Sequence, residues 1–154
     1  MEVEVKIPIG KSNRRVEKFF EREKFLTQEN WVYPVGRKVL RIRKEGKKGF
    51  LTIKGKNESE KFNSREESEI EFESECTEIV SLFDKIFGRP RYYSRKRASV
   101  LLEGTHVLLD VFENGNTYVE VEGDEKGIIS VLEKLDLNIL ENERRPYYEI
   151  EGDC

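Results

Sequence analysis

Charged residues alternate with apolar ones in several short segments of this sequence, first at Glu2, Glu4 and Lys6 in residues 1–7. Carboxylate oxygens bind hard divalent cations such as Mg²⁺, whereas ammonium and guanidinium groups bind phosphoryl oxygens. Alternate residues of a strand point to the same face, so each segment would place such groups side by side. This pattern predicts a site for a divalent metal and a phosphate-bearing ligand.

The same alternation recurs along the chain and assigns seven acidic and seven basic side chains to one face of the predicted strands. The acidic residues are Glu2, Glu4, Glu67, Glu69, Asp110, Glu120 and Glu122, and the basic residues are Lys6, Arg41, Arg43, Lys54, Arg65, Arg95 and Arg97. Like charges two residues apart on one face repel each other unless an opposite charge lies between them. A divalent metal on the carboxylates and a polyphosphate on the basic side chains would relieve both repulsions. Oxygen ligands without a His or Cys cluster favour Mg²⁺ or Mn²⁺ over zinc or copper.

The elements that must position these residues are mostly strands. Alternation predicts strands over 1–7, 29–33, 39–43, 50–55, 65–73, 95–102, 107–111 and 117–122, and a short one within 145–150. Helical spacing of apolar residues predicts a first helix capped by Ser12 and further helices over 77–87 and over about 125–135. The sequence has no linker or internal repeat, which predicts one α+β domain.

The apolar face of the strands includes Val5, Ile42, Ile53, Ile70 and Val119, and we expect the helices to cover it. Two arrangements satisfy this pattern. An open antiparallel sheet would leave its charged face in water. A sheet closed into a barrel would line a wet interior with the charged face.

The segment Glu2-Val3-Glu4-Val5-Lys6 resembles the Glu-x-Glu-x-Lys signature of the CYTH superfamily, the triphosphate tunnel metalloenzymes. Further segments resemble that family in the same order along the chain: Leu40-Arg41-Ile42-Arg43, Leu51-Thr52-Ile53-Lys54-Gly55, Arg65-Glu66-Glu67, Arg95-Lys96-Arg97, Leu109-Asp110, Tyr118-Val119-Glu120-Val121-Glu122 and Pro146-Tyr147. The family includes class IV adenylyl cyclases, thiamine triphosphatases and inorganic triphosphatases.

The resemblance implies a closed eight-stranded antiparallel β-barrel with helices outside, formed as a single domain by residues 1–154. It implies metal ligation by Glu2, Glu4, Glu120 and Glu122, with Asp110 and Glu67 or Glu69 as further ligands. It also implies that the basic residues named above bind the triphosphate and act in catalysis. A β-bulge in the acidic strand would place Glu66 in the tunnel instead of Glu67. The chain departs from the family pattern where Glu29-Asn30-Trp31 replaces Asp-x-Tyr and where Pro146-Tyr147 replaces Ser-Tyr.

We therefore expect an enzyme that uses Mg²⁺ or Mn²⁺ to hydrolyse a triphosphate, with inorganic triphosphate as the first substrate to consider. A class IV adenylyl cyclase and a thiamine or nucleoside triphosphatase are alternatives. An alternative from another class is a polyphosphate- or nucleic-acid-binding module without turnover, but such a module gains nothing from paired carboxylates beside phosphate.

Charge and hydropathy limit the partners. Lys and Arg total 28 and Asp and Glu total 31, which gives a net charge of −3. This balance disfavours nucleic acid or a membrane surface as the main partner, and we find no apolar run near the ~20 residues that span a bilayer. We expect a cytoplasmic monomer or homodimer that binds a small triphosphate-bearing molecule.

Overall fold

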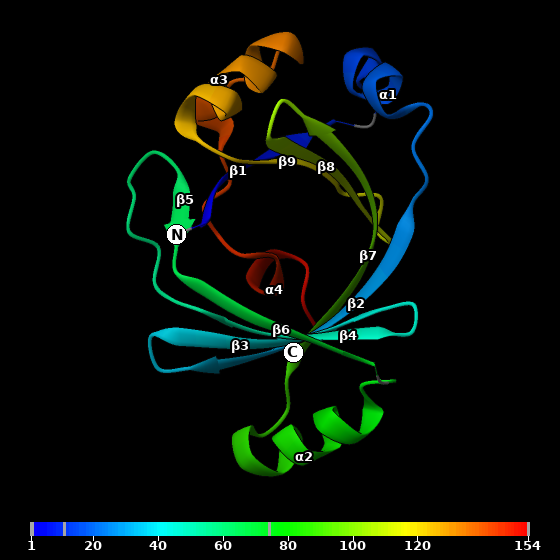
Figure 1. Ribbon diagram of the computed structural model, residues 1–154, viewed down its shortest axis with the longest axis vertical. Coiled ribbons are helices and arrows are strands. Elements are labelled where there is room, and N and C mark those ends of the chain that lie inside the picture. The colour runs from blue at the N-terminus through cyan, green and yellow to red at the C-terminus, as the bar shows by residue number, and fades with distance from the viewer. Residues whose placement is uncertain (1, 11, 74, 154) are drawn as a thin grey trace. The chain divides into compact units, whose positions relative to one another are not determined.

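The computed structural model describes residues 2–10, 12–73 and 75–153. Within them lie nine strands: β1 (Glu2–Ile9), β2 (Leu26–Val35), β3 (Lys38–Glu45), β4 (Lys48–Lys54), β5 (Asn63–Arg65), β6 (Glu67–Glu73), β7 (Arg91–Leu102), β8 (Thr105–Phe112) and β9 (Thr117–Glu122). The helices are α1 (Arg14–Phe20), α2 (Thr77–Phe87), α3 (Glu125–Lys134), the short 3₁₀ helix Ile139–Glu141 and α4 (Tyr147–Ile150) (Figure 1). None of these helices is long and apolar enough to cross a membrane.

Hydrogen-bonded strands follow the order β5-β1-β9-β8-β7-β2-β3-β4-β6. The pairs whose registers are defined, such as β1 with β9 and β3 with β4, are antiparallel. The predicted α+β class is therefore confirmed. The order has nine strands where the family resemblance implied eight, because residues 63–65 form a strand of their own, and the described residues include no pairing of β5 with β6 that would close a barrel.

The chain divides into two compact units, which we describe separately. The first contains the described parts of residues 1–26, 58–64 and 95–144. In its core, Val5 and Val119 of the strands pack with Val16 of α1 and with Ile128 and Val131 of α3. Figure 1 shows α1 and α3 on the same side of β1, β8 and β9. In this unit the apolar strand face is covered by helices, as predicted.

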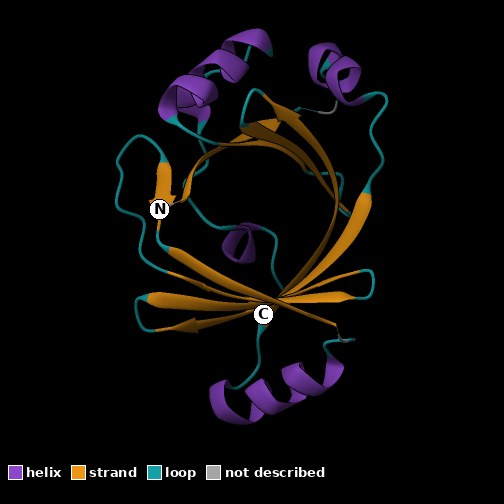
Figure 2. Ribbon diagram, in the orientation of Figure 1, coloured by secondary structure: helices purple, strands orange, loops and turns teal. Residues whose placement is uncertain are grey.

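The second unit contains the described parts of residues 27–57, 65–94 and 145–154. Helix α2, with the bounds that we predicted, covers β3, β4 and β6 on one face, and α4 lies on the opposite face (Figure 2). Buried Ile42 packs here with Leu51, Phe72 and Phe83. The predicted burial of Ile53 and Ile70 is wrong: they are 46% and 61% exposed, because α2 packs on other residues of that face.

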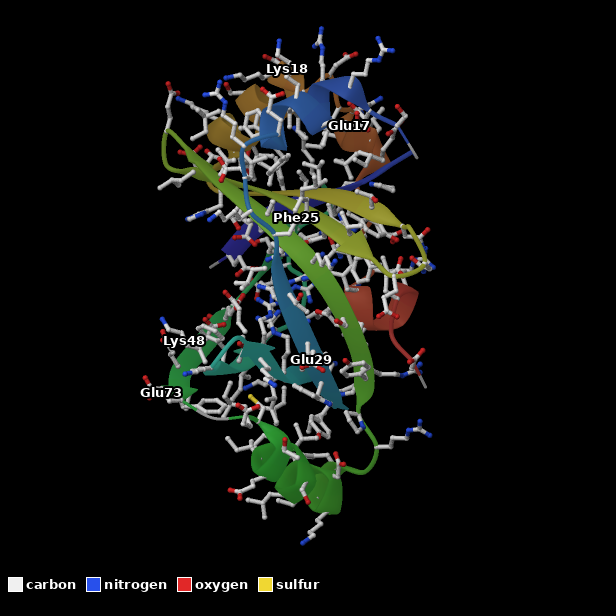
Figure 3. All side chains as sticks on the ribbon, turned by 90° about the vertical axis from the view of Figure 1, so that its right-hand side faces the viewer. Glu17, Lys18, Phe25, Glu29, Lys48 and Glu73 are labelled. Carbon is white, nitrogen blue, oxygen red and sulfur yellow. The ribbon has the colours of Figure 1, made fainter. Side chains whose placement is uncertain are left out.

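A close approach fixes the contact of β4 with β6 and the start of α2. A Cβ atom on Gly49 would lie 2.4 Å from the Phe72 ring and 2.9 Å from Cys76 Sγ. Only glycine therefore allows the ring to cross β4 at this point. At the outer end of the same strand pair, the surface residues Lys48 and Glu73 are opposite each other in register (Figure 3).

Three local predictions need correction. Helix α1 is capped by Asn13 and not by Ser12, because Asn13 Oδ1 accepts a hydrogen bond from Val16 N at 3.1 Å. Strand β7 begins at Arg91, four residues earlier than predicted. Residues 147–150 form α4 in place of the predicted strand, starting after Pro146, which lacks the N–H that a strand would use.

Candidate functional site

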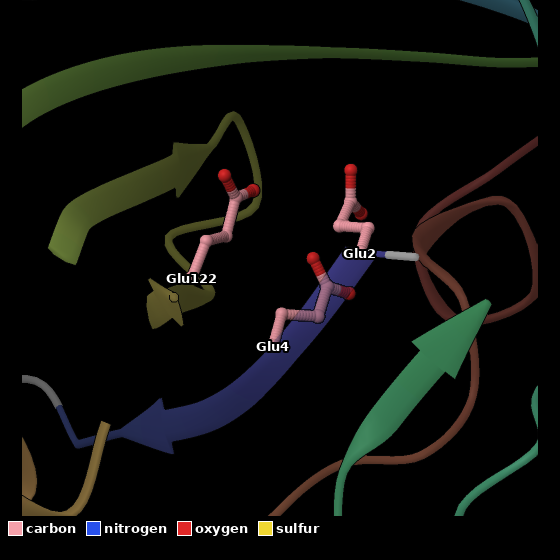
Figure 4. Close-up of side chains that lie close together, drawn as sticks. All are labelled: Glu2, Glu4 and Glu122. Atoms are coloured by element: carbon pink, nitrogen blue, oxygen red, sulfur yellow. The ribbon is translucent and has the colours of Figure 1, made fainter. Parts of the chain in front are cut away.

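Three carboxylates converge in the first unit. Glu4 of β1 lies opposite Glu122 of β9 in the antiparallel register, and Glu2 is two residues from Glu4 on the same strand face. Figure 4 shows their side chains gathered at the start of β1. One carboxylate oxygen from each residue lies within 4.8 Å of the others. This arrangement can supply three oxygen ligands to one divalent cation.

The carboxylates have unequal proton affinities. Burial, and then the negative charges of Glu120 and Glu2, raise the pKa of Glu122 to about 8 against the opposing charge of Arg97. Burial would also raise the pKa of Glu120, but the guanidinium groups of Arg97 and Arg95 outweigh it and hold that pKa well below its usual range. Glu120 is therefore ionised at neutral pH, whereas Glu122 retains a proton without a cation beside it.

Two arginines of β7 are held by acidic residues of β8 and β9. Arg97 Nε and Nη2 donate to Asp110 at 2.6 and 2.8 Å, and Arg97 Nη2 donates to Glu120 Oε2 at 3.0 Å. Arg95 Nη1 lies 3.4 Å from Asp110 Oδ2. Asp110 is 0% exposed. A buried carboxylate without a counter-charge destabilises the fold, so the contacts with Arg95 and Arg97 balance its charge. Lys6, also buried, is opposite Glu120 in the β1–β9 register.

The seven predicted metal ligands therefore fall into three groups. Glu2, Glu4 and Glu122 form the carboxylate cluster. Asp110 and Glu120 contact the arginines of β7. Glu67 and Glu69 belong to the second unit. Metal binding by any of the seven residues stays a prediction.

In the second unit, the charged face brings together basic and acidic residues of β3, β4 and β6. Lys54 Nζ lies 3.2 Å from Glu67 Oε2. Arg41 Nη2 lies 3.8 Å from Glu67 Oε1 and 3.6 Å from Glu69 Oε2. Of the two alternatives for the acidic strand, Glu67 is on the face with Lys54 and Arg41, whereas Glu66 is exposed between β5 and β6. Arg65, at the end of β5, is partly exposed.

Two polar residues that the sequence reasoning missed join this face. Thr52 lies between Arg41 and Glu69 in the strand registers, accepts from Arg41 Nη2 at 3.4 Å and donates to Glu69 Oε2 at 2.7 Å. Asn30 of β2 lies opposite Arg43, and its Oδ1 accepts from Arg43 Nε at 2.8 Å. The only available signal was their period-2 position opposite the arginines, which requires the strand register to be known.

A cavity of about 450 Å³ adjoins the carboxylate cluster. Its lining includes Glu2, Glu122 and His106. His106 is exposed, as predicted, and lies opposite Glu122 in the β8–β9 register. Two residues of the cluster, Glu2 and Glu122, therefore line a space large enough for small ligands.

The CYTH domain family model matches residues 1–148. The chain belongs to the CYTH domain family. The match confirms the family that the sequence motifs indicated. The matched range includes described residues of both units.

Solved structures share the fold. A conserved hypothetical protein from Pyrococcus furiosus is 28% identical, with 97% of this chain and 99% of that chain covered and a TM-score of 0.76. The PH1012 protein from Pyrococcus horikoshii is 24% identical, with 98% and 99% covered and a TM-score of 0.77. A structure from Bacillus halodurans, described as a candidate adenylate cyclase, is 16% identical, with 90% and 91% covered and a TM-score of 0.68. A search of curated proteins found no match.

Proposed function

We propose that this CYTH protein is a divalent-metal-dependent hydrolase of a triphosphate, with inorganic triphosphate as its substrate. The observation that supports this proposal is the convergence of Glu2, Glu4 and Glu122 in the same unit as the anchored arginines Arg95 and Arg97. Carboxylates alone would repel a polyphosphate, so their presence in such a site is explained by a cation between them and the ligand.

The residues present fit Mg²⁺ or Mn²⁺. All three donors are carboxylate oxygens, which these hard cations prefer. Burial and the neighbouring carboxylates raise the pKa of Glu122 to about 8, and a bound cation would remove the repulsion that contributes to this shift. When bound, the metal would polarise phosphoryl oxygens and lower the pKa of a water molecule.

The chain itself would bind and orient the substrate. Arg97 is held by both Asp110 and Glu120, so its guanidinium loses little freedom when it donates to a phosphoryl oxygen. We assign phosphate binding to Lys6, Arg95 and Arg97 in the first unit. In the second unit we assign it to Arg41, Arg43, Lys54 and Arg65, on the basis of the family motifs.

Hydrolysis requires a bond from a water oxygen to the terminal phosphorus and breakage of the bond from that phosphorus to the bridging oxygen. The products are orthophosphate and pyrophosphate. Charge builds up on the phosphoryl oxygens along this path, and preorganised guanidinium groups stabilise it without reorganising at the moment of reaction.

A second candidate is a class IV adenylyl cyclase. It would use the same groups for attack of the ribose 3′-hydroxyl on the α-phosphorus of ATP, with pyrophosphate leaving. The structures from Bacillus halodurans and Vibrio parahaemolyticus, both described as candidate adenylate cyclases, favour keeping this candidate, although at 16% identity each shows only the shared fold.

A product assay separates these functions. The protein is incubated with inorganic triphosphate, ATP or thiamine triphosphate, with Mg²⁺, with Mn²⁺ or with a chelator, and orthophosphate and cyclic AMP are quantified. We expect orthophosphate from inorganic triphosphate only when a metal is present. Cyclic AMP from ATP without orthophosphate would contradict the hydrolase proposal, and metal-dependent binding without any product would favour a binding module.

A further inference from the structure

Asn30 is fully buried in β2, and only one of the two polar atoms of its side-chain amide has a hydrogen-bond partner among the described residues. Its Oδ1 accepts from Arg43 Nε at 2.8 Å. Because Nε of a guanidinium group can only donate, the oxygen of the amide must face Arg43 and the nitrogen must face away from it. Within the described residues, Asn30 Nδ2 has no hydrogen-bond partner.

Arg41 supplies a second buried donor on the same strand pair. It is two residues from Arg43 on β3, and therefore on the same face as Asn30. Its Nη2 contacts Thr52 Oγ1 at 3.4 Å and Glu69 Oε2 at 3.6 Å. Its Nε, like Asn30 Nδ2, has no hydrogen-bond partner within the described part of the chain.

Two unsatisfied donors on neighbouring strands are unusual in a folded protein, because a buried donor without an acceptor destabilises the fold. The diagonal positions of an antiparallel pair are ~7–8 Å apart at their backbones, within reach of an Arg side chain. One group that carries several acceptor oxygens and no donor would satisfy both nitrogens. A phosphoryl group has this chemistry.

We propose that Asn30 Nδ2, together with Arg41 Nε, binds a phosphoryl oxygen of the substrate, and that Asn30 also orients Arg43 through its Oδ1. This inference rests on the proposed function and adds Asn30 to the substrate-binding residues. A carboxylate at this position would keep the acceptor for Arg43 but would place a negative charge where the donor is. Asparagine is therefore the side chain of this shape that can accept a hydrogen bond from Arg43 and also donate one to a phosphoryl oxygen.

Asn30→Asp tests the donor because it retains the acceptor for Arg43 and nearly the same volume. Binding of tripolyphosphate in the presence of Mg²⁺ is measured by isothermal titration calorimetry, and KM and kcat by phosphate release. We expect the dissociation constant and KM to rise by about tenfold or more, since the variant loses a donor to a charged acceptor and gains a repulsive charge. Asn114→Asp is the matched control: it adds the same charge in an exposed turn where Asn114 Oδ1 caps Asn116 N.

A second measurement on the unmodified protein does not depend on the variant folding. The side-chain amide protons of Asn30 are followed by ¹⁵N NMR while tripolyphosphate and Mg²⁺ are added, and we expect a downfield shift that saturates with binding. Binding of tripolyphosphate with an unchanged Asn30 amide signal would overturn the inference and leave the proposed function intact. Failure of the unmodified protein to bind tripolyphosphate at all would overturn the proposed function, and the inference with it.

Discussion

The two glutamates of β9 show how neighbours set the role of a residue. Glu120 and Glu122 share a strand face and are two residues apart, yet the pKa of Glu120 is held well below its usual range and that of Glu122 is raised to about 8. Burial raises both, and only Glu120 has Arg97 within hydrogen-bond distance among the described contacts. Glu120 therefore balances the arginines, and Glu122 completes the carboxylate cluster.

Metal binding should depend on pH through Glu122. Its carboxyl group must lose a proton to bind a cation, so Mg²⁺ affinity should rise as the pH increases toward about 8 and then level off. Calorimetric titration of Mg²⁺ at a series of pH values measures this. The Glu122→Gln variant should bind more weakly and with a flatter pH profile, and an equally steep profile in that variant would assign the dependence to another group.

The same raised pKa predicts a stability effect in the metal-free protein. A carboxyl group whose folded pKa exceeds its unfolded value of 4.5 favours the folded state fully at pH below 4.5 and loses this contribution as the pH rises to about 8. Urea denaturation should therefore show that Glu122→Gln reduces the loss of stability over this pH interval. The comparison with the unmodified protein cancels the titration of other groups.

The resemblance implies that Asp110 is a metal ligand, but its contacts with Arg95 and Arg97 predict that it acts on the arginines and not on the metal. Asp110→Asn removes a fully buried charge from Arg95 and Arg97, which should cost about 3 kcal/mol of unfolding free energy and raise KM for the triphosphate. Mg²⁺ affinity, measured without the triphosphate, should change by less than about threefold. A loss of Mg²⁺ affinity as large as that in Glu4→Gln would make Asp110 a ligand instead.

At the scale of elements, α2 is attached to the strands of its unit through Tyr33. The Tyr33 hydroxyl lies 2.6 Å from Asp84 Oδ1 and 3.2 Å from the Val80 carbonyl oxygen. Burial, and then the hydrogen bond to Asp84, raise the pKa of this hydroxyl, so it remains a donor at any physiological pH. The Tyr33 ring also packs against Phe83 at 5.9 Å between centroids.

Tyr33→Phe should remove the hydroxyl contacts and retain the ring packing. The unfolding free energy should fall by about 1 kcal/mol, because Asp84 is exposed and water can replace the lost donor. Urea denaturation with an unchanged m-value measures this. A fall in unfolding free energy of several kcal/mol would contradict this prediction, because the hydroxyl contacts with Asp84 and Val80 would not account for it.

Elements with local signals could be predicted from the sequence. The bounds of α2 follow from the apolar spacing of Ile79, Val80 and Phe83 and from the terminal Gly88. β5 and α4 could not be predicted, because three or four residues carry too little periodicity. Glu2, Glu4 and Glu122 were predicted from alternation, whereas the separate roles of Asp110, Asn30 and Thr52 depend on strand registers between distant segments.

At the scale of the whole molecule, the chain has the fold of solved structures that are 16–28% identical to it, with TM-scores of 0.68–0.77. The arrangement of alternating charged and apolar residues explains how such a fold can provide both a core and a site. In the first unit, Val5 and Val119 are buried with the helices, while Glu4 and Lys6 take the other face. The two faces of these strands therefore serve core packing and the candidate site separately.

The central claim is that the carboxylate cluster makes the chain a metal-dependent triphosphatase. Phosphate release from inorganic triphosphate with Mg²⁺ should be compared among the unmodified protein, Glu4→Gln and Glu17→Gln. Glu17 is the matched control, since it is an exposed residue of α1. We predict that Glu4→Gln lowers the rate by about a hundredfold and that Glu17→Gln does not change it. Full activity of Glu4→Gln, or activity of the unmodified protein that persists under a chelator, would contradict the claim.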